Sequence, residues 1–317
     1  MTFFITMECF NAVAFFSGDI TMALNDQSTS CWVCGSTELT LDKRSDVDST
    51  LSSKNFEITD KNYGVTFAIY RCIKCDFLQC SDAENILDYY TNMVDNGYEL
   101  TRDQRAIQAQ RIVTNMARFS LPPATHIDVG AGSGILVQQA VAAGYNSVGI
   151  EPSVDLYKKA AVLELPMING VLPSEEAGDD YNIVTLIDII EHVTDPLSLL
   201  LNIKNVMGEE AVLFIDTPDV KSLAAKIMGR RWWHYRVAHV GYFDNNTMAI
   251  LLDRAGLEVI SVVRPMWYFP INYLIERVVS YLPKWLHFSL PGFIGDITVP
   301  INLYDSMRVV CCKKNLG

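Results

Sequence analysis

Three glycines in one short turn limit what this chain can fold into. Residues 126–134 read HIDVGAGSG, and the apolar stretch ILVQQAVAAG follows directly. Gly130, Gly132 and Gly134 therefore fall between a predicted buried strand and a predicted helix. Glycine permits a positive φ and lets the backbone approach a ligand closely. Turns of this kind lie at the carboxyl ends of strands in open α/β sheets, where ligands bind, so the turn predicts a ligand-binding α/β domain.

The spacing of these glycines argues against a dinucleotide ligand. The dinucleotide fingerprint G-x-G-x-x-G/A, counted from Gly130, requires a small residue at position 135, where the chain has Ile135. The next predicted strand ends at Glu151, whose carboxylate can accept hydrogen bonds from both hydroxyls of a ribose. Asp128 would lie beneath the turn, near a cationic end of the ligand. The pattern favours a nucleoside ligand held without phosphate contacts, and the alternative is an ordinary strand–helix turn with an exposed glutamate.

Predicted strands and helices alternate beyond this turn. The alternation indicates a doubly wound α/β sheet. One helix begins at Asp195 with an aspartate N-cap and a proline in its first turn, and another begins after Asp244. Seven strands are predicted, which gives a seven-stranded Rossmann-like sheet. Their sequences are THIDVG, SVGIEPS, PMIN, NIVTLIDI, AVLFIDTP, LEVISVVRP and MRVVCCKK.

Two CxxC turns precede this domain. CWVCGS contains Cys31 and Cys34, CIKCDF contains Cys72 and Cys75, and 37 residues separate the two turns. Two such turns can complete a closed tetrahedral site for a structural zinc ion, and the alternative is four unligated thiols. The chain has no basic residue before Lys43 and hence no secretory signal. Without such a signal, paired CxxC turns hold a metal more often than a disulfide.

These features divide the chain into four parts and one insert. The first part is a leader that is either poorly ordered or a helix docked on the core. The predicted parts are the leader at 1–22, a zinc-ribbon-like module at 23–82, a helical connector at 83–119 and the ligand-binding domain at 120–317, with an aromatic-rich insert at 266–305. No apolar run reaches the roughly 18 residues that span a bilayer, which favours a cytoplasmic protein.

The motifs in this order resemble the class I S-adenosylmethionine-dependent methyltransferases. The resemblance covers residues 120–317 and rests on DVGAGSG, on the acid in VGIEPS and on DIIEHVTDP (188–196). The last segment is similar to the one that follows strand four in methyltransferases related to the ubiquinone-biosynthesis O-methyltransferases. The paired CxxC turns are similar to those of a zinc-containing subset that includes methyltransferases acting on deoxysugars. The resemblance implies that the cofactor is S-adenosylmethionine.

The resemblance also implies roles for particular residues. The three glycines of the turn would contact the methionine and ribose portions of the cofactor, and Glu151 would hold the ribose. Gly170 and Val171 follow the third strand, where family members line the adenine, and here they replace a frequent Asp-containing pair. Leu186 and Ile187 end the fourth strand and would run along the sulfonium.

The acceptor side is expected to contain histidines. Methyl transfer from a sulfonium is an in-line displacement that needs positioning and exclusion of water, and a hydroxyl or acidic-carbon acceptor also needs a general base. His239, in the segment HVGYFD, matches an "H…YFS" element of similar enzymes and is the predicted base, with the alternative that it only fixes its loop. His192 would orient the acceptor or the cofactor, or else hydrogen-bond its own loop. Tyr242 would form the wall of the site or substitute for the base.

Together these features predict a methyltransferase with a small-molecule acceptor, preferably a sugar or sugar nucleotide, methylated at oxygen or carbon. A catalytically silent cofactor-binding scaffold is the main alternative. A nucleic-acid methyltransferase is a lesser one, because 37 Asp and Glu against 25 Lys and Arg give a net charge of −12, which is unfavourable for holding a phosphate backbone. The insert at 266–305 would be a lid, a dimer surface, extra core packing or a helix against lipid, and its few basic residues disfavour membrane contact. The oligomeric state is open.

Overall fold

The centre of the fold is a seven-stranded sheet. The computed structural model describes residues 30–47, 51–60, 62–279, 282–283, 285, 288, 290–295 and 297–314, so the predicted leader lies outside the described residues. The strand order is β10-β13-β8-β7-β4-β5-β6, and β13 is antiparallel to both of its neighbours while the other strands are parallel. This order confirms the predicted doubly wound, Rossmann-like sheet. The strands are β4 (Thr125–Val129), β5 (Asn146–Glu151), β6 (Met167–Asn169), β7 (Tyr181–Ile187), β8 (Met207–Pro218), β10 (Leu257–Val263) and β13 (Ser306–Lys313).

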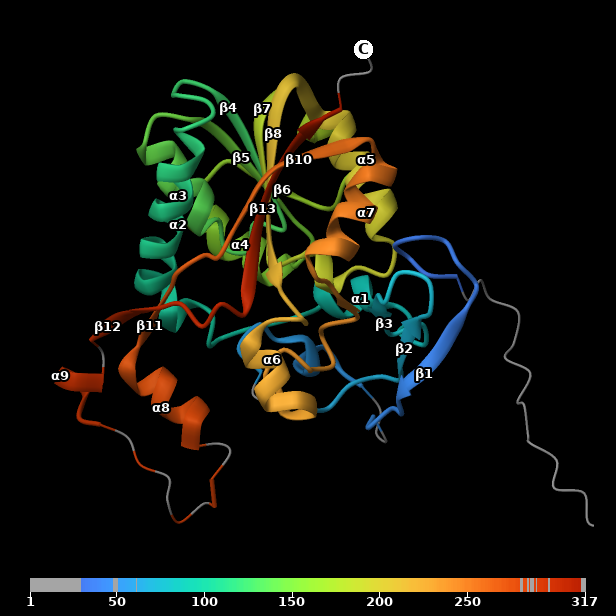
Figure 1. Ribbon diagram of the computed structural model, residues 1–317. Coiled ribbons are helices and arrows are strands. Elements are labelled where there is room, and N and C mark those ends of the chain that lie inside the picture. The colour runs from blue at the N-terminus through green and yellow to red at the C-terminus, as the bar shows by residue number, and fades with distance from the viewer. Residues whose placement is uncertain are drawn as a thin grey trace, which may run out of the picture.

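Helices cover both faces of this sheet (Figure 1). On one face Ile112 and Leu136 pack with Phe214 in a single apolar core, and on the other face Leu200 and Leu251 pack against the opposite sides of the strands. Because both faces are covered, the central strands read as nearly continuous apolar runs. The first face carries α2 (Arg102–Met116), α3 (Ile135–Ala142) and α4 (Val154–Val162), and the second carries α5 (Pro196–Val206) and α7 (Asn245–Ala255).

Residues at both ends of helix α7 determine where it begins and ends. Asp244 accepts hydrogen bonds from the backbone N–H groups of Asn246 and Thr247, at 2.8 and 2.9 Å. The Thr247 hydroxyl in turn accepts from the backbone N–H of Asp244 at 2.9 Å, which completes a capping box. The helix ends at Gly256, whose φ of 73° is a left-handed conformation that glycine adopts without strain.

A second sheet joins the cysteine-containing part of the chain to the α/β part. Its order is β1-β2-β3-β9, so three strands before residue 80 pair with one strand that follows β8 in the sequence. We call the described residues 30–80, with their two CxxC turns, the four-cysteine module. The strands are β1 (Leu39–Lys43), β2 (Ile69–Cys72), β3 (Leu78–Gln79) and β9 (Gly241–Tyr242). The segment predicted as a connector contains α1 (Ile86–Thr91), η2 (Glu99–Thr101) and α2, and α2 packs directly on the central sheet.

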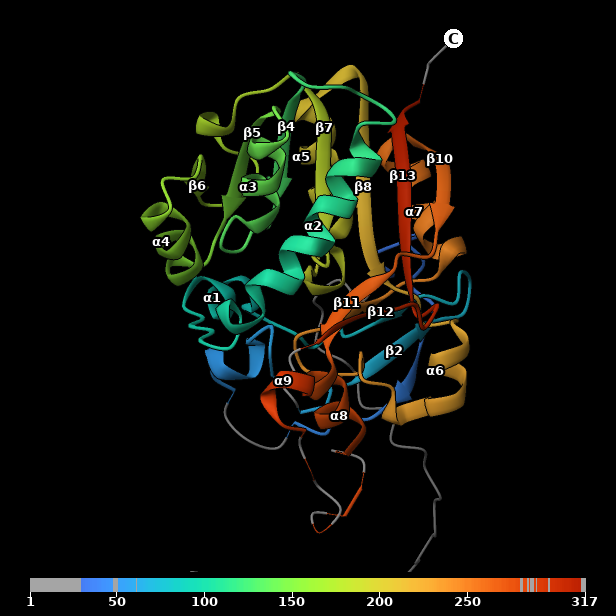
Figure 2. The ribbon, with the colours of Figure 1, turned by 90° about the vertical axis from the view of Figure 1, so that its left-hand side faces the viewer.

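The aromatic-rich insert lies at the same end of the molecule as the four-cysteine module (Figure 2). Its two strands pair antiparallel beside α2, where Gln104 donates to Thr298 at 3.3 Å. The insert contains β11 (Trp267–Pro270), α8 (Ile271–Val279), α9 (Gly292–Gly295) and β12 (Thr298–Ile301). The remaining short elements are α6 (Leu223–Met228), η1 (Ser53–Phe56), η3 (Glu175–Ala177), η4 (Ile190–His192) and η5 (Gly229–Arg231).

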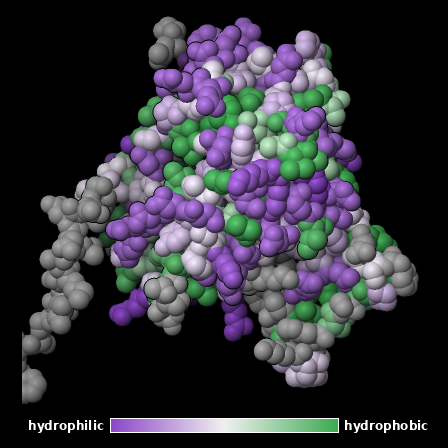
Figure 3. Space-filling view, turned by 180° about the vertical axis from the view of Figure 1, so that it is seen from behind, coloured by the Kyte–Doolittle hydropathy of each residue, from purple (hydrophilic) through white to green (hydrophobic). Residues whose placement is uncertain are grey.

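On the face seen in Figure 3, apolar side chains are interspersed with hydrophilic ones. Among the described residues, every helix is too short or too polar to cross a bilayer.

Candidate cofactor and acceptor site

A cavity of about 1170 Å³ opens at the carboxyl ends of the parallel strands. Its wall includes the glycine turn, the end of β5, the η4 loop and the segment around His239. Residues of α2 and of the insert, such as Tyr268, close it from the other side. The cavity therefore lies where the strand order of an α/β sheet places ligands, and it brings most of the predicted site residues together.

The glycine turn and Glu151 form one hydrogen-bonded unit. Glu151 accepts from the backbone N–H of Gly132 at 2.8 Å and from that of Ser153 at 2.7 Å. Its side chain is buried and lines the cavity, so it is not the exposed glutamate of the alternative interpretation. Each carboxylate oxygen keeps a lone pair for a ligand hydroxyl, which fits the predicted contact with a ribose.

The three glycines of the turn serve different purposes. All three have positive φ, of 77°, 56° and 73°. A side chain on Gly130 would collide with Ile189 and one on Gly132 with the Tyr98 hydroxyl, and both glycines line the cavity. Gly134 lies outside the cavity wall, and a side chain there would collide with Leu165. Gly134 therefore allows close packing of α3 on its neighbours, while the other two allow close approach to the cavity.

Of the remaining predicted cofactor residues, some line the cavity and one lies in the core of the opposite face. Gly170 and Val171 line the cavity, and a side chain on Gly170 would meet nothing within 4 Å, so there is room beside it for a ring. Ile187 also lines the cavity. Leu186 is fully buried in the core on the opposite face, against α5 and α7, because successive residues of a strand point to opposite faces. Leu186 therefore does not reach the cavity.

Acidic side chains are concentrated in this cavity. Burial raises the pKa of Glu151 to about 7, although the Ser153 and Gly132 N–H groups oppose the shift. Burial also raises the pKa of Asp128 to about 7, against the effect of the hydrogen bond that it accepts from Thr185 at 2.6 Å. Asp188, which follows β7, has its pKa raised to about 7 by burial and by the nearby Asp216. Arg105 and Arg308 partly offset the shift at Asp188, whereas among the described residues no cationic group lowers the pKa of Asp128 or Glu151, and such buried carboxyls suit a ligand that brings positive charge.

His192 is held as a neutral ring at the start of the acceptor side. Its Nδ1 lies 2.7 Å from the carbonyl of Ala238 and 2.5 Å from the Tyr90 hydroxyl. A carbonyl only accepts, so Nδ1 of the neutral ring carries the proton and donates it to Ala238. Burial lowers the pKa of His192 to about 3, which keeps the ring neutral at ordinary pH.

His239 lies beside His192 with the rings edge to face, 4.8 Å between centroids. Its Nδ1 has no hydrogen-bond partner among the described residues, while the ring also hydrogen-bonds the backbone of His234. The proton therefore lies on Nε2, and Nδ1 is a bare acceptor. Burial, and then the neighbouring His192 and Arg236, hold the pKa of His239 well below its usual range. Ligand atoms of Glu191, His192 and His239 lie within 4.8 Å of one another.

Tyr242 is placed differently from the other predicted acceptor residues. It is buried in the second sheet and is absent from the cavity wall. Its hydroxyl donates to the carbonyl of His239 at 2.9 Å. The structure thus places Tyr242 behind His239 and not at the cavity.

Three residues of the site, Tyr90, Tyr98 and Asp188, escape prediction from the sequence. Tyr98 lies over Gly132, and Tyr90 contacts His192, although both belong to the segment predicted as a connector. Arg236 lines the cavity, and its guanidinium donates to the carbonyls of Glu57 and Ile58. Asp188 belongs to DIIEHVTDP, in which the sequence predicts a role for His192 alone. No local pattern marks Tyr90 or Tyr98, whereas three acids in DIIEHVTDP directly after a strand are a signal for Asp188 and Glu191.

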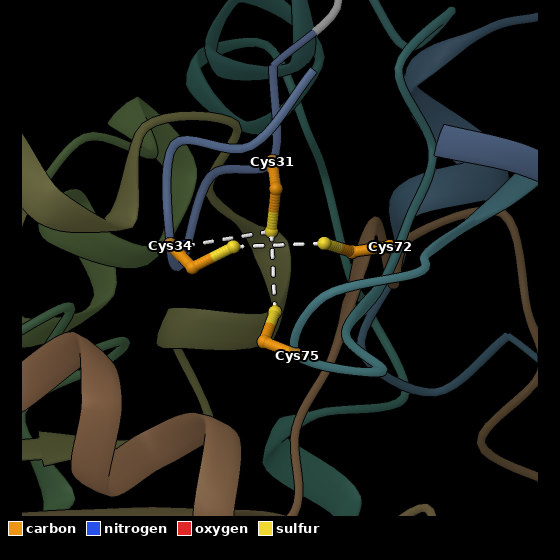
Figure 4. Close-up of side chains that lie close together, drawn as sticks. All are labelled: Cys31, Cys34, Cys72 and Cys75. Atoms are coloured by element: carbon orange, nitrogen blue, oxygen red, sulfur yellow. Dashed lines mark hydrogen bonds between the residues drawn. The ribbon is translucent and has the colours of Figure 1, made fainter. Parts of the chain in front are cut away.

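The four cysteines of the two CxxC turns converge at one point (Figure 4). The sulfurs of Cys31 and Cys75 lie 3.5 Å apart, as do those of Cys34 and Cys72, and all four lie within 4.8 Å of one another. A tetrahedral zinc ion with Zn–S bonds of about 2.3 Å requires sulfurs about 3.8 Å apart. Burial raises the pKa of Cys31 to about 11 and raises that of Cys75 further, so a bound metal would displace protons from these thiols.

Comparisons with known proteins identify the family of the chain. Residues 101–262 match the model of a family described as a methyltransferase domain. A ubiquinone biosynthesis O-methyltransferase from Xanthomonas campestris pv. campestris (strain B100) is 26% identical over 199 residues, which are 56% of this chain and 81% of that protein. The enzyme of the same name from Dinoroseobacter shibae is 25% identical over 149 residues, which are 43% of this chain and 60% of that protein.

One solved structure shares the fold at a TM-score of 0.51. It is a chain from the complex that contains the Haloferax volcanii Trm112 methyltransferase activator. The likeness covers 69% of this chain and 93% of that chain at 13% identity. At that identity the likeness concerns the fold alone.

Proposed function

We propose that this chain, which belongs to the methyltransferase family whose domain model it matches, methylates a hydroxyl of a small, largely apolar acceptor. The premise is that the chain is an S-adenosylmethionine-dependent methyltransferase. The observation that carries the proposal is the single cavity in which the Glu151 unit and the two neutral histidines lie together. The relatives named above are O-methyltransferases of ubiquinone biosynthesis, which supports oxygen as the methylated atom.

The cofactor half of the cavity would hold S-adenosylmethionine, which supplies a methyl group on a positively charged sulfur. Glu151 would bind the ribose hydroxyls, and Gly130 and Gly132 would let the ligand lie against the turn. Gly170 and Val171 would face the adenine, and Ile187 the sulfonium. The ionised forms of Asp128 and Asp188 would balance the positive charges of the ligand.

The acceptor half is mostly apolar, which favours an apolar acceptor over the sugar or sugar nucleotide predicted from the resemblance. Polar side chains such as Gln104 and Gln108 also line the cavity, but most of its wall is apolar, and a sugar would need a hydrogen-bond partner for each hydroxyl that it buries. The apolar side chains on this part of the wall are Phe56, Ile58, Phe269, Leu274, Val278, Ile301 and Leu303.

We assign the general base to His239, with His192 orienting the acceptor hydroxyl. As the acceptor oxygen bonds to the methyl carbon and the carbon–sulfur bond breaks, the hydroxyl proton would pass to Nδ1 of His239. Burial weakens this base, because it penalises the imidazolium that would form. A weak base suits an acidic hydroxyl such as a phenol, whose pKa is about 10 as in tyrosine, better than a sugar hydroxyl.

The four-cysteine module would hold a structural zinc ion. Four cysteine ligands fill a tetrahedral site and leave no position for a reactant. Zinc content measured on the purified chain, with loss of the metal in a Cys72→Ser variant, checks this part of the proposal.

Titration calorimetry with S-adenosylhomocysteine is the first test of the function. Binding to the folded wild-type protein is expected, and no measurable heat of binding would overturn the assignment. Release of S-adenosylhomocysteine is then followed with three acceptors: an alkylated catechol, catechol itself and a nucleoside-diphosphate sugar. Turnover is expected to be fastest with the alkylated catechol and to fall in a His239→Ala variant. Preference for the sugar nucleotide would reverse the acceptor assignment, and binding without any turnover would favour the scaffold.

A further inference from the structure

One residue, Val240, connects the four-cysteine module to the segments that carry both acceptor-side histidines. The N–H of Cys80 donates to the carbonyl of Val240 at 2.8 Å, and the N–H of Val240 donates to the carbonyl of Glu191 at 2.8 Å. Val240 directly follows His239, and Glu191 directly precedes His192. Backbone hydrogen bonds therefore run without a gap from the module, through the His239 segment, to the loop that carries His192.

The strand that makes this connection is tied to both CxxC turns. β3 follows the second turn directly and pairs with β9, with Leu78 opposite Tyr242 and Gln79 opposite Gly241. The buried side chain of Gln79 accepts from the N–H of Trp32, in the first turn, at 2.9 Å. The cysteine cluster therefore fixes the position of β9, because β3 contacts both.

Side chains reinforce the same junction. The Phe77 ring lies 4.8 Å from the Phe243 ring, between centroids, and both are fully buried. Lys221 bridges Asp76 of the second CxxC turn, at 2.9 Å, and Asp244 at the start of α7, at 2.8 Å. These contacts flank the segment 237–242 on the side away from the cavity.

Tyr242 links this junction to the base itself. Its buried hydroxyl donates to the carbonyl of His239, and the Cys80 sulfur lies 4.0 Å from the same carbonyl. Because Tyr242 is absent from the cavity wall, it acts on His239 and not on a ligand. Tyr242 is a positioning residue and not a catalytic one.

We propose that the four-cysteine module is the positioning element of the acceptor half of the site: with its metal bound, it fixes the segment 237–242 through β3, and Tyr242 sets the backbone of His239. The inference rests on the proposed role of His239 and on metal binding by the cysteines. The cofactor half is fixed separately, because Glu151 is held by the backbone of Gly132 and Ser153. The two halves should therefore respond differently when the metal is removed.

Hydrogen–deuterium exchange on the full chain tests this separation. The zinc-loaded protein is compared with protein stripped by a strong chelator, and S-adenosylhomocysteine binding is measured on both. Amides of 237–243 are expected to exchange at least about tenfold faster after stripping. Amides of 127–135 are expected to change less than about twofold, and the Kd for S-adenosylhomocysteine less than about threefold. Unchanged protection at 237–243, or equal loss at both segments, overturns the proposal.

A substitution that leaves the metal in place gives an independent test. Tyr242→Phe removes one hydroxyl, and Tyr145→Phe is the matched control, because Tyr145 is equally buried and donates to the Ser120 carbonyl at 2.9 Å. In zinc-loaded protein with ¹⁵N-labelled histidines, the imidazole signals of His239 are expected to shift only in Tyr242→Phe. No shift, or the same shift in both variants, overturns the proposal.

The two proposals can fail separately. If S-adenosylhomocysteine does not bind the zinc-loaded wild type, the proposed function falls, whatever the exchange data show. If it binds and the amide exchange of 237–243 does not change when the metal is removed, the function stands and the positioning role falls.

Discussion

At the scale of single residues, Glu151 is the side chain on which cofactor recognition depends most. Its carboxylate accepts two backbone N–H groups, so the glycine turn and the carboxylate hold each other in place. This arrangement reduces the conformational freedom that binding must remove, because the acceptor oxygens are already oriented.

Replacing this carboxylate with an amide should weaken cofactor binding. In Glu151→Gln one backbone N–H faces an NH₂ group and the charge is lost, so the Kd for S-adenosylhomocysteine should rise by about 10- to 100-fold. Titration calorimetry measures the change. Glu209→Gln is the control, because Glu209 is 92% exposed and pairs with Lys313 far from the cavity wall. An unchanged Kd in Glu151→Gln would remove the ribose contact from the site.

The raised pKa values of the cavity acids predict how binding depends on pH. Burial raises the pKa of Glu151 from 4.5, and that of Asp128 from 3.8, to about 7. Below pH 7 both carboxyls of the cofactor-free protein become protonated, so affinity should fall by up to about tenfold per pH unit for each group that binds as the anion. Titrations between pH 8 and pH 5.5 measure this, and a flat profile would contradict it.

The same shifts predict the opposite trend for stability without cofactor. A carboxyl whose pKa is higher in the folded state than in the unfolded state binds its proton more tightly when folded. Its contribution to stability is therefore present below about pH 4 and is lost as pH rises through about 7. Thermal unfolding with and without S-adenosylhomocysteine should show the largest gain from the ligand above pH 7.

At the scale of secondary-structure elements, one residue at the start of α7 makes two stabilising interactions. Asp244 caps the helix and also pairs with Lys221 at 2.8 Å. Asp244→Ala should lower the free energy of unfolding by about 1–2 kcal/mol, the usual cost of losing an N-cap. Asp253→Ala on the same helix should cost less than about 0.5 kcal/mol, because Asp253 is 68% exposed and its ion pair with Lys314 is screened. Chemical denaturation measures both, and equal costs would contradict the prediction.

Elements also mark the limit of what the sequence could predict. The glycine turn, the capped helices and the paired cysteines follow from local spacing, and the seven alternating strands follow from their apolar runs. The choice between Leu186 and Ile187 depends on which face of β7 turns toward the cavity, which periodicity alone leaves open. The contacts of Tyr90 with His192 and of Cys80 with Val240 join residues more than 100 positions apart, and no local pattern encodes them.

At the scale of the whole molecule, the four-cysteine module and the catalytic domain share one core. Cys31, Val33 and Phe77 belong to the same apolar cluster as Phe243 and Met248 of the domain. A module that shares its core with a domain cannot unfold without exposing the surface of that domain. The module and the domain are therefore separate segments of the sequence, but they are packed together as one unit.

This sharing predicts a single unfolding transition. Calorimetry of the zinc-loaded protein should give one peak with equal calorimetric and van't Hoff enthalpies, because the shared core couples the two parts. Adding a chelator should move that peak to lower temperature without splitting it, since the metal stabilises only the folded state. Two peaks, with only the first sensitive to the chelator, would show that the module unfolds alone.

The position of β13 has a consequence for biosynthesis. β13 follows β10 in the chain but lies between β8 and β10 in the sheet, antiparallel to both. While the ribosome is still translating residues 264–305, the strand that pairs with β10 does not yet exist. The backbone hydrogen-bonding groups of β10 therefore stay unpaired until β13 is made. The nascent chain can assemble the parallel strands as they emerge, but the sheet closes only when residues 306–313 have cleared the exit tunnel.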